Sequence, residues 1–384
     1  MSATEPVYVV GVGVYPFGRH PGVSGLDMGV SATRAALQDA GVAWGEIDLA
    51  VGGSNTAKPD SLVARLGLTG LPFTSVRNGC ATGAVALSVA ANALRVGDLA
   101  VVVGFDKHER GAFASDPVTY GLSPWYADMG LMVTTQYFAM RTRRYMHEFG
   151  LTEPTLASVA ERASRGGAAS PTAWRRRQLS SEEVLASPMV NDPLTTMMFC
   201  QPDEGGVALV LARGGRALDL CDRPVRLASV AVRTRGPGSF EVFSPWLTPE
   251  RAGSPTVAAA EAAFAAAAAR PADMQVAQLQ DTDCGSELIH LAETGLCADG
   301  EQEQLMAEGA TDSGGRLPVN TDGGCLANGE PVGASGLRQI AEVARQLQGR
   351  AAGLVVSGHP SLGFTHVYGA PGVSACSVLT TRSE

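Results

Sequence analysis

Short β-branched apolar runs alternate along the first half of the chain with longer segments that have helical spacing. The two patterns predict strands at residues 8–12, 47–51, 73–76 and 98–103, and helices at 26–40, 61–66 and 81–94. Gly41, directly after the first long helix, is a typical C-terminal cap. Strands that alternate with helices predict an α/β fold whose largely parallel sheet is covered by helices on both faces.

The second half of the chain repeats this order of elements. The first half closes with a predicted strand at residues 206–211. The predicted strands of the second half lie at residues 225–232, 274–279, 353–357 and 374–379, and its predicted helices at 256–269, 286–292 and 336–347. Two successive halves with the same order of strands and helices indicate an internal duplication. We therefore divide the chain into an N-terminal half, residues 1–215, and a C-terminal half, residues 216–384.

The stretch between residues 105 and 205 interrupts the alternation. It is rich in aromatic residues and has helical spacing at 129–148 and 155–164. We expect it to be an insertion that folds over the sheet and covers a pocket, rather than a separate domain. Its basic run, Arg175 to Arg177, is either a solvated surface or a binding site for nucleotide phosphates, which suit the arginine fork.

Composition narrows the class of protein. The 384 residues are 45% hydrophobic and 17% charged, as in a compact globular protein larger than one ordinary domain. The net charge of -9 argues against a general nucleic-acid binder, although a local basic patch for an anionic CoA ester stays compatible with it. The cysteine and histidine spacings predict no disulfide framework and no metal site. We see no signal peptide and no membrane span, and expect a cytoplasmic protein.

Cys80 stands at the turn between the predicted strand 73–76 and the helix that follows it. At such a turn, the free amides and the positive end of the helix stabilise a thiolate or a developing oxyanion. Cys80 is therefore a candidate covalent nucleophile. Because free cysteine is also among the most buried residue types, a cysteine of the core is the equal alternative.

Three later loops share the glycine-rich or polar character of the Cys80 turn and follow predicted strands. Open α/β sheets carry their sites at such strand ends. The loops, with the Cys80 turn first, are Asn78–Gly83, Asp281–Gly285, Asn320–Gly336 and His366–Gly372.

These loops resemble, in order, the loops of the thiolase superfamily. NGCATG at 78–83 is similar to the nucleophile loop, and GEPVGASG at 329–336 to the Gly-His-Pro-x-Gly-x-x-Gly loop. Residues 281–285 stand where sterol-carrier-type thiolases have His-Asp-Cys-Phe, and 366–372 resemble the closing His-Asn-x-Gly-x-Gly-Gly loop. The first 53 residues also read like the first lobe of these enzymes.

The resemblance implies a thiolase fold, with duplicated βαβαβαββ halves in a five-layered α-β-α-β-α sandwich. It implies acyl-CoA as the substrate, with no separate cofactor, and a homodimer. It also implies Cys80 as nucleophile, Cys284 as acid/base cysteine and His366 in the closing loop. We expect further substrate contacts from the same loops, at Asn78, Thr282, Gly333 and Gly372.

Two departures from the family pattern alter the expected chemistry. Glu330 replaces the histidine of the Gly-His-Pro loop, and Thr282 replaces the first histidine of His-Asp-Cys-Phe. An ionised carboxylate only accepts hydrogen bonds and repels an enolate, so ordinary thiolysis is disfavoured. Actinobacterial lipid-transfer proteins, which are steroid side-chain aldolases that work with a small zinc-ribbon/OB-fold partner, share such altered loops.

Retro-aldol cleavage of a β-hydroxyacyl-CoA is therefore the first hypothesis. A Glu330 with a pKa raised by burial would be the base, and Tyr368 or His366 would donate to the thioester enolate. Thiolase-type acyl transfer through Cys80 and a weakly active subunit that needs a partner are the alternatives. A structural role is the equal alternative for Glu330, and a position in the core is the alternative for Cys284.

Other candidates carry less weight. We expect His359 to lie in a surface loop, and we assign no task to Cys325. The remaining histidines are isolated in the sequence and are expected to be structural or exposed: His20, His108, His147 and His290.

Overall fold

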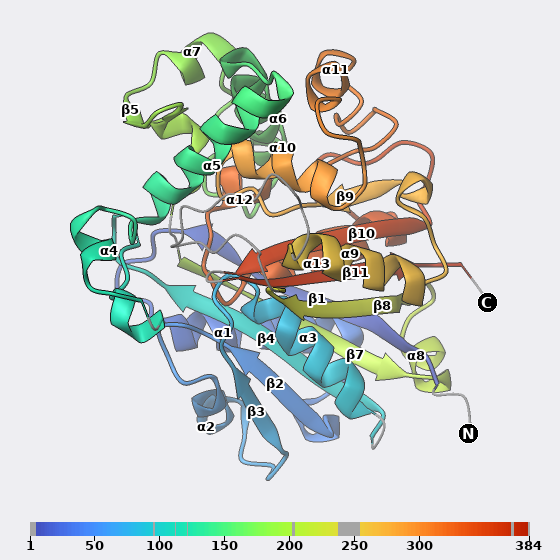
Figure 1. The fold of residues 1–384 in the computed structure, drawn as a ribbon. Helices are drawn as coiled ribbons and strands as arrows, with labels where there is room; N and C mark the ends of the chain where they lie inside the picture. Colours follow the sequence, from blue (N-terminus) through green and yellow to red (C-terminus); the bar gives the residue numbers. More distant parts are fainter. Residues whose placement is uncertain are drawn as a thin grey trace.

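The computed structural model describes residues 5–94, 97–111, 113–120, 122–201, 204–236, 254–369 and 372–382. Its main sheet has nine strands in the order β3-β2-β4-β7-β1-β8-β11-β10-β9 (Figure 1). The strands of the first half are β1 (Val7–Gly18), β2 (Leu49–Gly53), β3 (Phe73–Val76), β4 (Leu99–Lys107) and β7 (Glu204–Arg213). Those of the second half are β8 (Val225–Thr234), β9 (Val276–Gln278), β10 (Leu362–Gly369) and β11 (Val373–Thr380).

Strand pairing repeats between the halves. In the first half β1 is antiparallel to β7, β7 is antiparallel to β4, and β4, β2 and β3 run parallel. In the second half β8 is antiparallel to β11, β11 to β10, and β10 is parallel to β9. A parallel bridge between Ala277 and Val319 takes the place of β3. The duplication is thus confirmed, while the division at residue 215 stays a prediction. The expectation of a largely parallel sheet is wrong: five of the eight described strand pairs of the main sheet are antiparallel, because β1, β7, β8 and β11 pair only in that sense.

Four long helices make the layers. Helix α1 (Gly25–Ala40) packs on β1, β7 and β4, and α9 (Pro255–Ala266) packs on β8 and β11. Helices α3 (Thr82–Ala93) and α13 (Ser335–Gln348) pack on each other and on the opposite face of the strands, through Leu87, Leu337 and Ile340 among others. The layers are, in order, α1, the strands of the first half, the α3–α13 pair, the strands of the second half, and α9. This order is the predicted five-layered sandwich.

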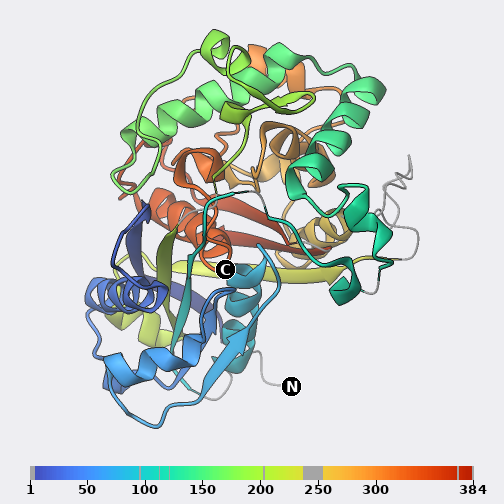
Figure 2. The ribbon, with the colours of Figure 1, turned by 90° about the vertical axis from the view of Figure 1, so that its left-hand side faces the viewer.

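The insertion between β4 and β7 is helical, as predicted. It contains α4 (Trp125–Asp128), α5 (Thr134–Phe149), α6 (Glu153–Ala169) and α7 (Ser181–Leu185), and the short pair β5 (Met189–Asn191) and β6 (Leu194–Thr195). Helices α5 and α6 pack on α10 (Cys284–Glu293), and α6 also packs on α12 (Gly324–Asn328). The insertion therefore covers the second half, as Figure 2 shows with the green helices above the orange and red segments.

Three smaller helices complete the described regular structure outside the 3-10 turns: α2 (Val63–Leu66), α8 (Gly215–Leu220) and α11 (Gln302–Ala307). Arg176 and Arg177 are exposed, and Arg177 pairs with Glu183 at 2.8 Å. His359 is exposed, as predicted. Within the described residues, no helix combines the length and the apolar character that crossing a bilayer requires.

Two predictions around the last strands are wrong. Residues 353–357 form no strand, and His366–Gly369 are not loop but the end of β10. Both faces of β10 are buried, and its polar residues are buried with the apolar ones. Because a strand buried on both faces need not alternate polar and apolar residues, its sequence looked like a loop between glycines.

Candidate active site

The Cys80 turn joins β3 to α3, as predicted. Gly79 has a φ of 55°, a left-handed conformation that glycine adopts without strain. Thr82 fastens the turn: its hydroxyl donates to the Gly79 carbonyl at 2.6 Å and accepts from the Asn78 amide at 2.8 Å. Cys80 is half-buried two residues before the helix starts, so the turn presents its thiol to the loops of the second half.

Glu330 lies against this thiol. Its side chain is only 2% exposed and forms a hydrogen bond with Cys80. Three further donors surround the carboxylate: the Thr282 hydroxyl at 3.1 Å, the Cys200 thiol at 3.6 Å, and the Gln280 amide. We call these five residues, Cys80, Cys200, Gln280, Thr282 and Glu330, the thiol–carboxylate cluster.

Burial sets the protonation of this cluster. It raises the pKa of the Glu330 carboxyl above its ordinary value, although the hydrogen bonds from Cys80, Thr282 and Gln280 partly oppose the rise. Burial also raises the pKa of the Cys80 thiol well above its ordinary value, and the neighbouring Glu330 raises it further. Burial and Glu330 therefore favour the neutral Cys80 thiol over the thiolate that the helix end was expected to stabilise.

Cys325, to which the sequence assigned no task, lies near the same cluster. It is fully buried in α12, and its amide donates to Asp281 at 2.7 Å. Burial raises the pKa of its thiol well above the ordinary value, with added contributions from Asp281 and Glu330. The short helix α12 returns the chain toward Glu330, which spacing alone does not reveal.

A second group of buried polar residues surrounds His366 and Tyr368 on β10. It joins them to residues of α5 and α10 that the sequence did not single out together. We call Tyr137, Arg141, His290, Glu293, His366 and Tyr368 the histidine–tyrosine cluster.

Glu293 is the centre of this second cluster. Its Oε2 lies 2.8 Å from Arg141 Nη2 and 2.8 Å from His290 Nδ1. The rings of His290 and His366 are 4.4 Å apart, and His366 Nε2 is 3.2 Å from the Thr256 hydroxyl. His290 is thus buried in a network rather than isolated.

The charged neighbours in the histidine–tyrosine cluster lower the pKa of its carboxylate, whereas the pKa of Glu330 is raised. Burial would raise the pKa of Glu293, but Arg141 and His290 outweigh burial and lower that pKa far below its ordinary value. Burial lowers the pKa of His366 well below its ordinary value, and His290 lowers it further. Burial raises the pKa of Tyr137, which is hydrogen-bonded to Tyr368, to about 12.

The two clusters are related by strand β10. Val367 packs with Ala81 and Ala84 on the side of the Cys80 turn. Since successive side chains point to opposite faces of a strand, His366 and Tyr368 point to the other side, toward α9 and α10. At the end of the strand, Gly369 lies so close to the Asn78 carbonyl that a Cβ atom there would be 2.2 Å from it. Tyr368 is therefore the last side chain before the Cys80 turn.

The other predicted residues belong to neither cluster. Cys284 is the first residue of α10 and is fully buried in the hydrophobic core. Gly333 is buried with its amide donated to Asp106 at 2.6 Å, and the Gly372 amide donates to Gly369 at 2.9 Å. The substrate contacts assigned to Asn78, Thr282, Gly333 and Gly372 stay predictions, as do all catalytic roles.

Comparison with known proteins agrees with this architecture. A family model described as Thiolase C-terminal domain-like matches residues 248–382. The acetyl-CoA acetyltransferase of Methanothermobacter thermautotrophicus is 31% identical over 98% of this chain and 99% of its own. The chain belongs to the thiolase superfamily.

Relatives within the superfamily differ in the activities that their names state. The 17-hydroxy-3-oxo-4-pregnene-20-carboxyl-CoA lyase of Mycobacterium tuberculosis is 31% identical over 94% of both chains. Among solved structures, an Ltp2-ChsH2(DUF35) aldolase matches with a TM-score of 0.86 and 27% identity, over 98% of this chain and 97% of that chain. The predicted fold, superfamily and lipid-transfer-protein group are thus confirmed.

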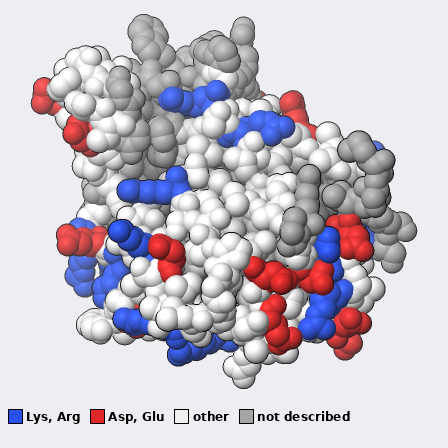
Figure 3. Space-filling model, turned by 90° about the horizontal axis from the view of Figure 1, so that it is seen from below, with Lys and Arg blue, Asp and Glu red and all other residues white. Residues whose placement is uncertain are grey.

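One cavity of this thiolase-superfamily protein opens beside the thiol–carboxylate cluster, and a second cavity adjoins the first. The first, of about 450 Å³, is lined by Cys200 and by Thr135, Trp174 and Phe199 among others. The second, of about 660 Å³, shares Arg19 and Arg110 with it. On the face of the molecule shown in Figure 3, basic and acidic side chains are interspersed. The first cavity therefore reaches the cluster at Cys200, and two arginines lie where the cavities meet.

Proposed function

We propose that the chain cleaves a carbon–carbon bond next to an acyl-CoA thioester, by retro-aldol cleavage of a β-hydroxyacyl-CoA. One observation carries this proposal: a buried glutamate with a raised pKa replaces the family's histidine and touches the Cys80 thiol. A carboxylate with a raised pKa is suited to take a proton near neutral pH. It is a poor donor to a thioester enolate, so it suits the hydroxyl end of the substrate.

In the proposed reaction, Glu330 takes the proton of the β-hydroxyl group. The oxygen electrons form a carbonyl, the bond between the α and β carbons breaks, and its electrons pass to the thioester as an enolate. The proton that Glu330 gained is then returned to the α carbon. The products are an aldehyde or ketone and a shortened acyl-CoA, without free CoA and without an acyl-enzyme.

The enolate oxygen needs a hydrogen-bond donor, and we assign that role to Tyr368. Tyr368 precedes Gly369, which contacts the Cys80 turn, and its side chain points to the opposite face of β10, so the assignment requires the thioester end of the substrate to reach that face. Burial raises the pKa of Tyr368 well above its ordinary value, which keeps the phenol protonated. One such donor is typically worth about 10²–10³ in rate.

The substrate would enter through the cavity lined by Cys200. Its 450 Å³ fall within the usual range for small-molecule sites. Arg19 and Arg110, at the junction of the two cavities, offer charge for the phosphates of CoA. The roles of Thr135 and Trp174 would be apolar contact with the acyl chain.

The test is product analysis. Purified protein is mixed with a β-hydroxyacyl-CoA in the absence of free CoA, and the products are identified by liquid chromatography and mass spectrometry. We expect a carbonyl compound and a shortened acyl-CoA in equal amounts. A strict requirement for free CoA would overturn the lyase proposal.

Acyl transfer through Cys80 is the second candidate, and one observation favours it. The hydrogen bond between the Cys80 thiol and Glu330 would allow the carboxylate to deprotonate a nucleophilic cysteine. This reaction predicts an acyl adduct on Cys80 in the intact mass of the protein after mixing with acyl-CoA. A Cys80→Ala variant with wild-type turnover would exclude it.

We also propose that the protein forms a homodimer and works with a small zinc-ribbon/OB-fold partner. The aldolase structure that matches this chain is named as a complex of two proteins. Strand β3 ends the main sheet, so its outer edge is free among the described strands for pairing with a second copy. Light scattering of the purified protein tests the dimer. Full turnover without any added protein would show that the partner is not required.

A further inference from the structure

The segment that carries Glu330 is fastened to the first half of the molecule by its backbone amides. We call residues 330–334, between α12 and α13, the Glu330 loop. Its first and last amides donate to backbone carbonyls, and Pro331 has no amide hydrogen. The two remaining amides, of Val332 and Gly333, donate to side chains of the first half.

Asp106, near the end of β4, accepts one of these two bonds. It is fully buried, and its Oδ2 accepts from the Gly333 amide at 2.6 Å. Its Oδ1 accepts from the hydroxyls of Ser54 and Thr56, in the turn after β2, at 2.6 and 2.8 Å. Burial would raise the pKa of Asp106, but His108 and these two hydroxyls outweigh burial and lower it. An ionised carboxylate therefore joins β2, β4 and the Glu330 loop.

The backbone of the loop lies directly against both strands. A Cβ atom at Gly104 of β4 would collide with the Gly333 carbonyl oxygen, and one at Gly333 would be 2.6 Å from the Gly53 carbonyl oxygen. Contacts with the ends of β2 and β4 thus set the position of the loop that carries Glu330.

His108, directly after β4, accepts the second bond, and one of its ring nitrogens has two competing partners. The residue is 9% exposed. Its Nε2 lies 3.4 Å from the Val332 amide nitrogen and 3.5 Å from Asp106 Oδ2. Nε2 accepts from Val332 only while it has no proton, and it can donate to Asp106 only when it has one. The two contacts therefore exclude each other.

Protonation of His108 decides between these contacts. In the imidazolium both ring nitrogens carry a proton, so Nε2–H would face the Val332 N–H and be attracted to the Asp106 carboxylate. The ring lines the second cavity, through which protons can reach it. Other charged or titratable groups line that cavity: Arg19, His20, Lys107, Glu109, Arg110 and Glu204.

The charged neighbours of His108 have partners other than its ring. Arg19 donates to the His108 carbonyl at 2.9 Å, and Glu204 lies 3.8 Å from Arg19 and 3.5 Å from Lys107. On the Glu330 loop, the Glu330 carboxyl is hydrogen-bonded to Cys80. Within the described part of the chain, the ion pair of the His108 ring is with Asp106.

We propose that Asp106 and His108 are positioning residues for Glu330, and that His108 holds the loop only in its neutral form. Asp106 holds the loop in either state, whereas neutral His108 holds Val332, which Pro331 joins to Glu330. Because proline fixes its own φ, a displacement of Val332 is passed to Glu330. The functional meaning of this inference rests on the proposed role of Glu330, but its experiment reads the loop itself.

Hydrogen–deuterium exchange of the full chain, read by mass spectrometry, tests the inference. Peptides that cover the Glu330 loop report the Val332 amide, and each exchange rate is compared with the intrinsic rate at the same pH. In the wild type, protection should fall about fivefold from about pH 8 to about pH 5.5, the equivalent of one neutral hydrogen bond.

Two variants of His108 isolate its proton. His108→Gln should stay protected at both pH values, because a glutamine amide oxygen accepts from Val332 and does not titrate. His108→Ala should be poorly protected at both. A fall in His108→Gln as large as in the wild type, or wild-type protection in His108→Ala, would overturn the inference.

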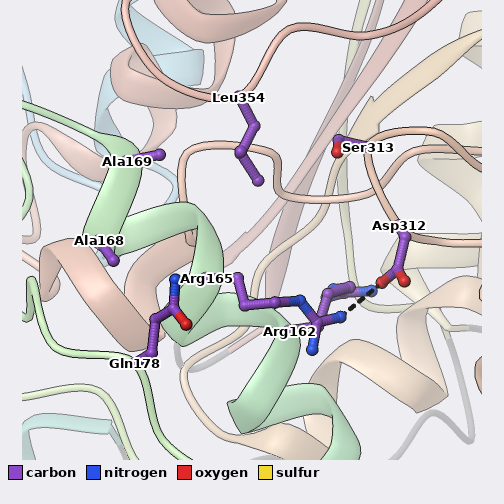
Figure 4. A pocket seen from close by; sticks show the side chains of 8 residues that line it. All are labelled: Arg162, Arg165, Ala168, Ala169, Gln178, Asp312, Ser313 and Leu354. Carbon is purple, nitrogen blue, oxygen red and sulfur yellow. Dashed lines mark hydrogen bonds and ion pairs between the residues drawn. The ribbon is translucent and has the colours of Figure 1, made fainter.

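Two controls separate this effect from a general loss of contacts. His147→Gln changes an exposed histidine of α5. Asp312→Asn breaks the ion pair with Arg165 at a cavity of about 360 Å³ beside α6, whose lining residues, drawn in Figure 4, include none of the Glu330 loop. Both variants should lose protection on acidification as the wild type does. Protection that stays constant in either control would contradict the assignment to His108.

Turnover distinguishes this inference from the proposed function. If Glu330 is the base, His108→Ala should lower kcat for a β-hydroxyacyl-CoA by up to about 10²-fold with little change in KM, and His108→Gln should restore most of the loss. The expected exchange pattern without any lyase activity would overturn the proposed reaction and support the positioning of the loop. Lyase activity with a wild-type kcat in His108→Ala would overturn the positioning role.

Discussion

Glu330 and Glu293 are both buried carboxylates next to predicted catalytic residues, and their surroundings differ in charge. Glu330 is held by neutral donors, and burial raises its pKa. Glu293 is held by Arg141 and His290, which lower its pKa despite burial. Burial moves the pKa of the carboxyl beside the neutral donors toward neutral pH, whereas the cations keep the other carboxylate ionised. Burial alone therefore does not make a base: the charge of the partners decides.

Because of this difference, we expect the two clusters to have different functions. The thiol–carboxylate cluster should carry the proton transfer, and its loss should reduce turnover more than stability. The ion pairs of the histidine–tyrosine cluster should hold α5, α10 and β10 together, and their loss should reduce stability. Tyr368 is the expected exception, because it lies at the end of β10 next to the Cys80 turn.

The largest effect is expected from Glu330→Gln, which keeps the shape of the side chain and removes the base. Turnover of a β-hydroxyacyl-CoA should fall by about 10²–10⁴, the usual contribution of a general base, with little change in KM. Steady-state kinetics measures it. Cys80→Ala serves as the comparison and should lose much less if cleavage is a retro-aldol reaction. The opposite ranking would make Cys80 the catalytic group.

Glu293→Gln should act mainly on stability. It leaves the buried Arg141 without its charge partner, which costs about 3 kcal/mol or more. Chemical denaturation of the variant and the wild type gives the free energy of unfolding. The matched carboxylate variant Glu330→Gln should not be destabilised. Unchanged stability of Glu293→Gln would contradict the structural role of the second cluster.

The tyrosine pair offers a finer test. Tyr368→Phe removes the proposed donor to the enolate and should reduce kcat by about 10²-fold or somewhat less. Tyr137→Phe removes the hydrogen-bond partner of Tyr368 and should cost only a few-fold, since the phenol that touches substrate remains. If the two variants lose equal activity, Tyr368 acts through packing and not as a donor.

The smallest effect is a pH dependence of stability. The folded pKa of Glu330 is raised above its unfolded value, so the neutral carboxyl is favoured in the fold and stability is lost as pH rises through the folded pKa. Relative to the wild type, Glu330→Gln should have the same Tm near pH 4 and a higher Tm near pH 8. The difference at pH 8 should correspond to about 1 kcal/mol in the free energy of unfolding. Thermal melts at the two pH values measure it. A difference that shrinks with rising pH would mean that the Glu330 carboxylate is favoured in the fold.

Much of the fold was predictable because its cues are local. Gly41 caps α1 in a left-handed conformation, and the apolar spacing after Cys80 gave the position of α3. The strand β10 was missed because its buried faces carry His366 and Thr365 as well as apolar residues. A polar residue in a strand does not indicate exposure when its side chain forms a hydrogen bond in the interior.

The candidate site was predicted less well than the fold. Cys284 lies in the core at the start of α10, and its catalytic role stays a prediction, while Cys200 and Cys325, which were given no role, lie near Glu330. His290 was expected to be isolated, although its ring lies tilted against that of His366, with the centroids 4.4 Å apart. Loop motifs identify which segments approach the site, but they do not say which side chain of each segment points into it.

The sequence by itself determined the duplicated α/β order, the superfamily and the replacement of a histidine by Glu330. The order follows from the spacing of apolar residues, and the other two follow from short loop motifs. Only the tertiary structure decided which buried groups share an environment. Cys200 and Glu330 are 130 residues apart in the chain and 3.6 Å apart in space. The pKa of a buried group depends on the charges within a few ångströms of it, and those neighbours come from distant segments.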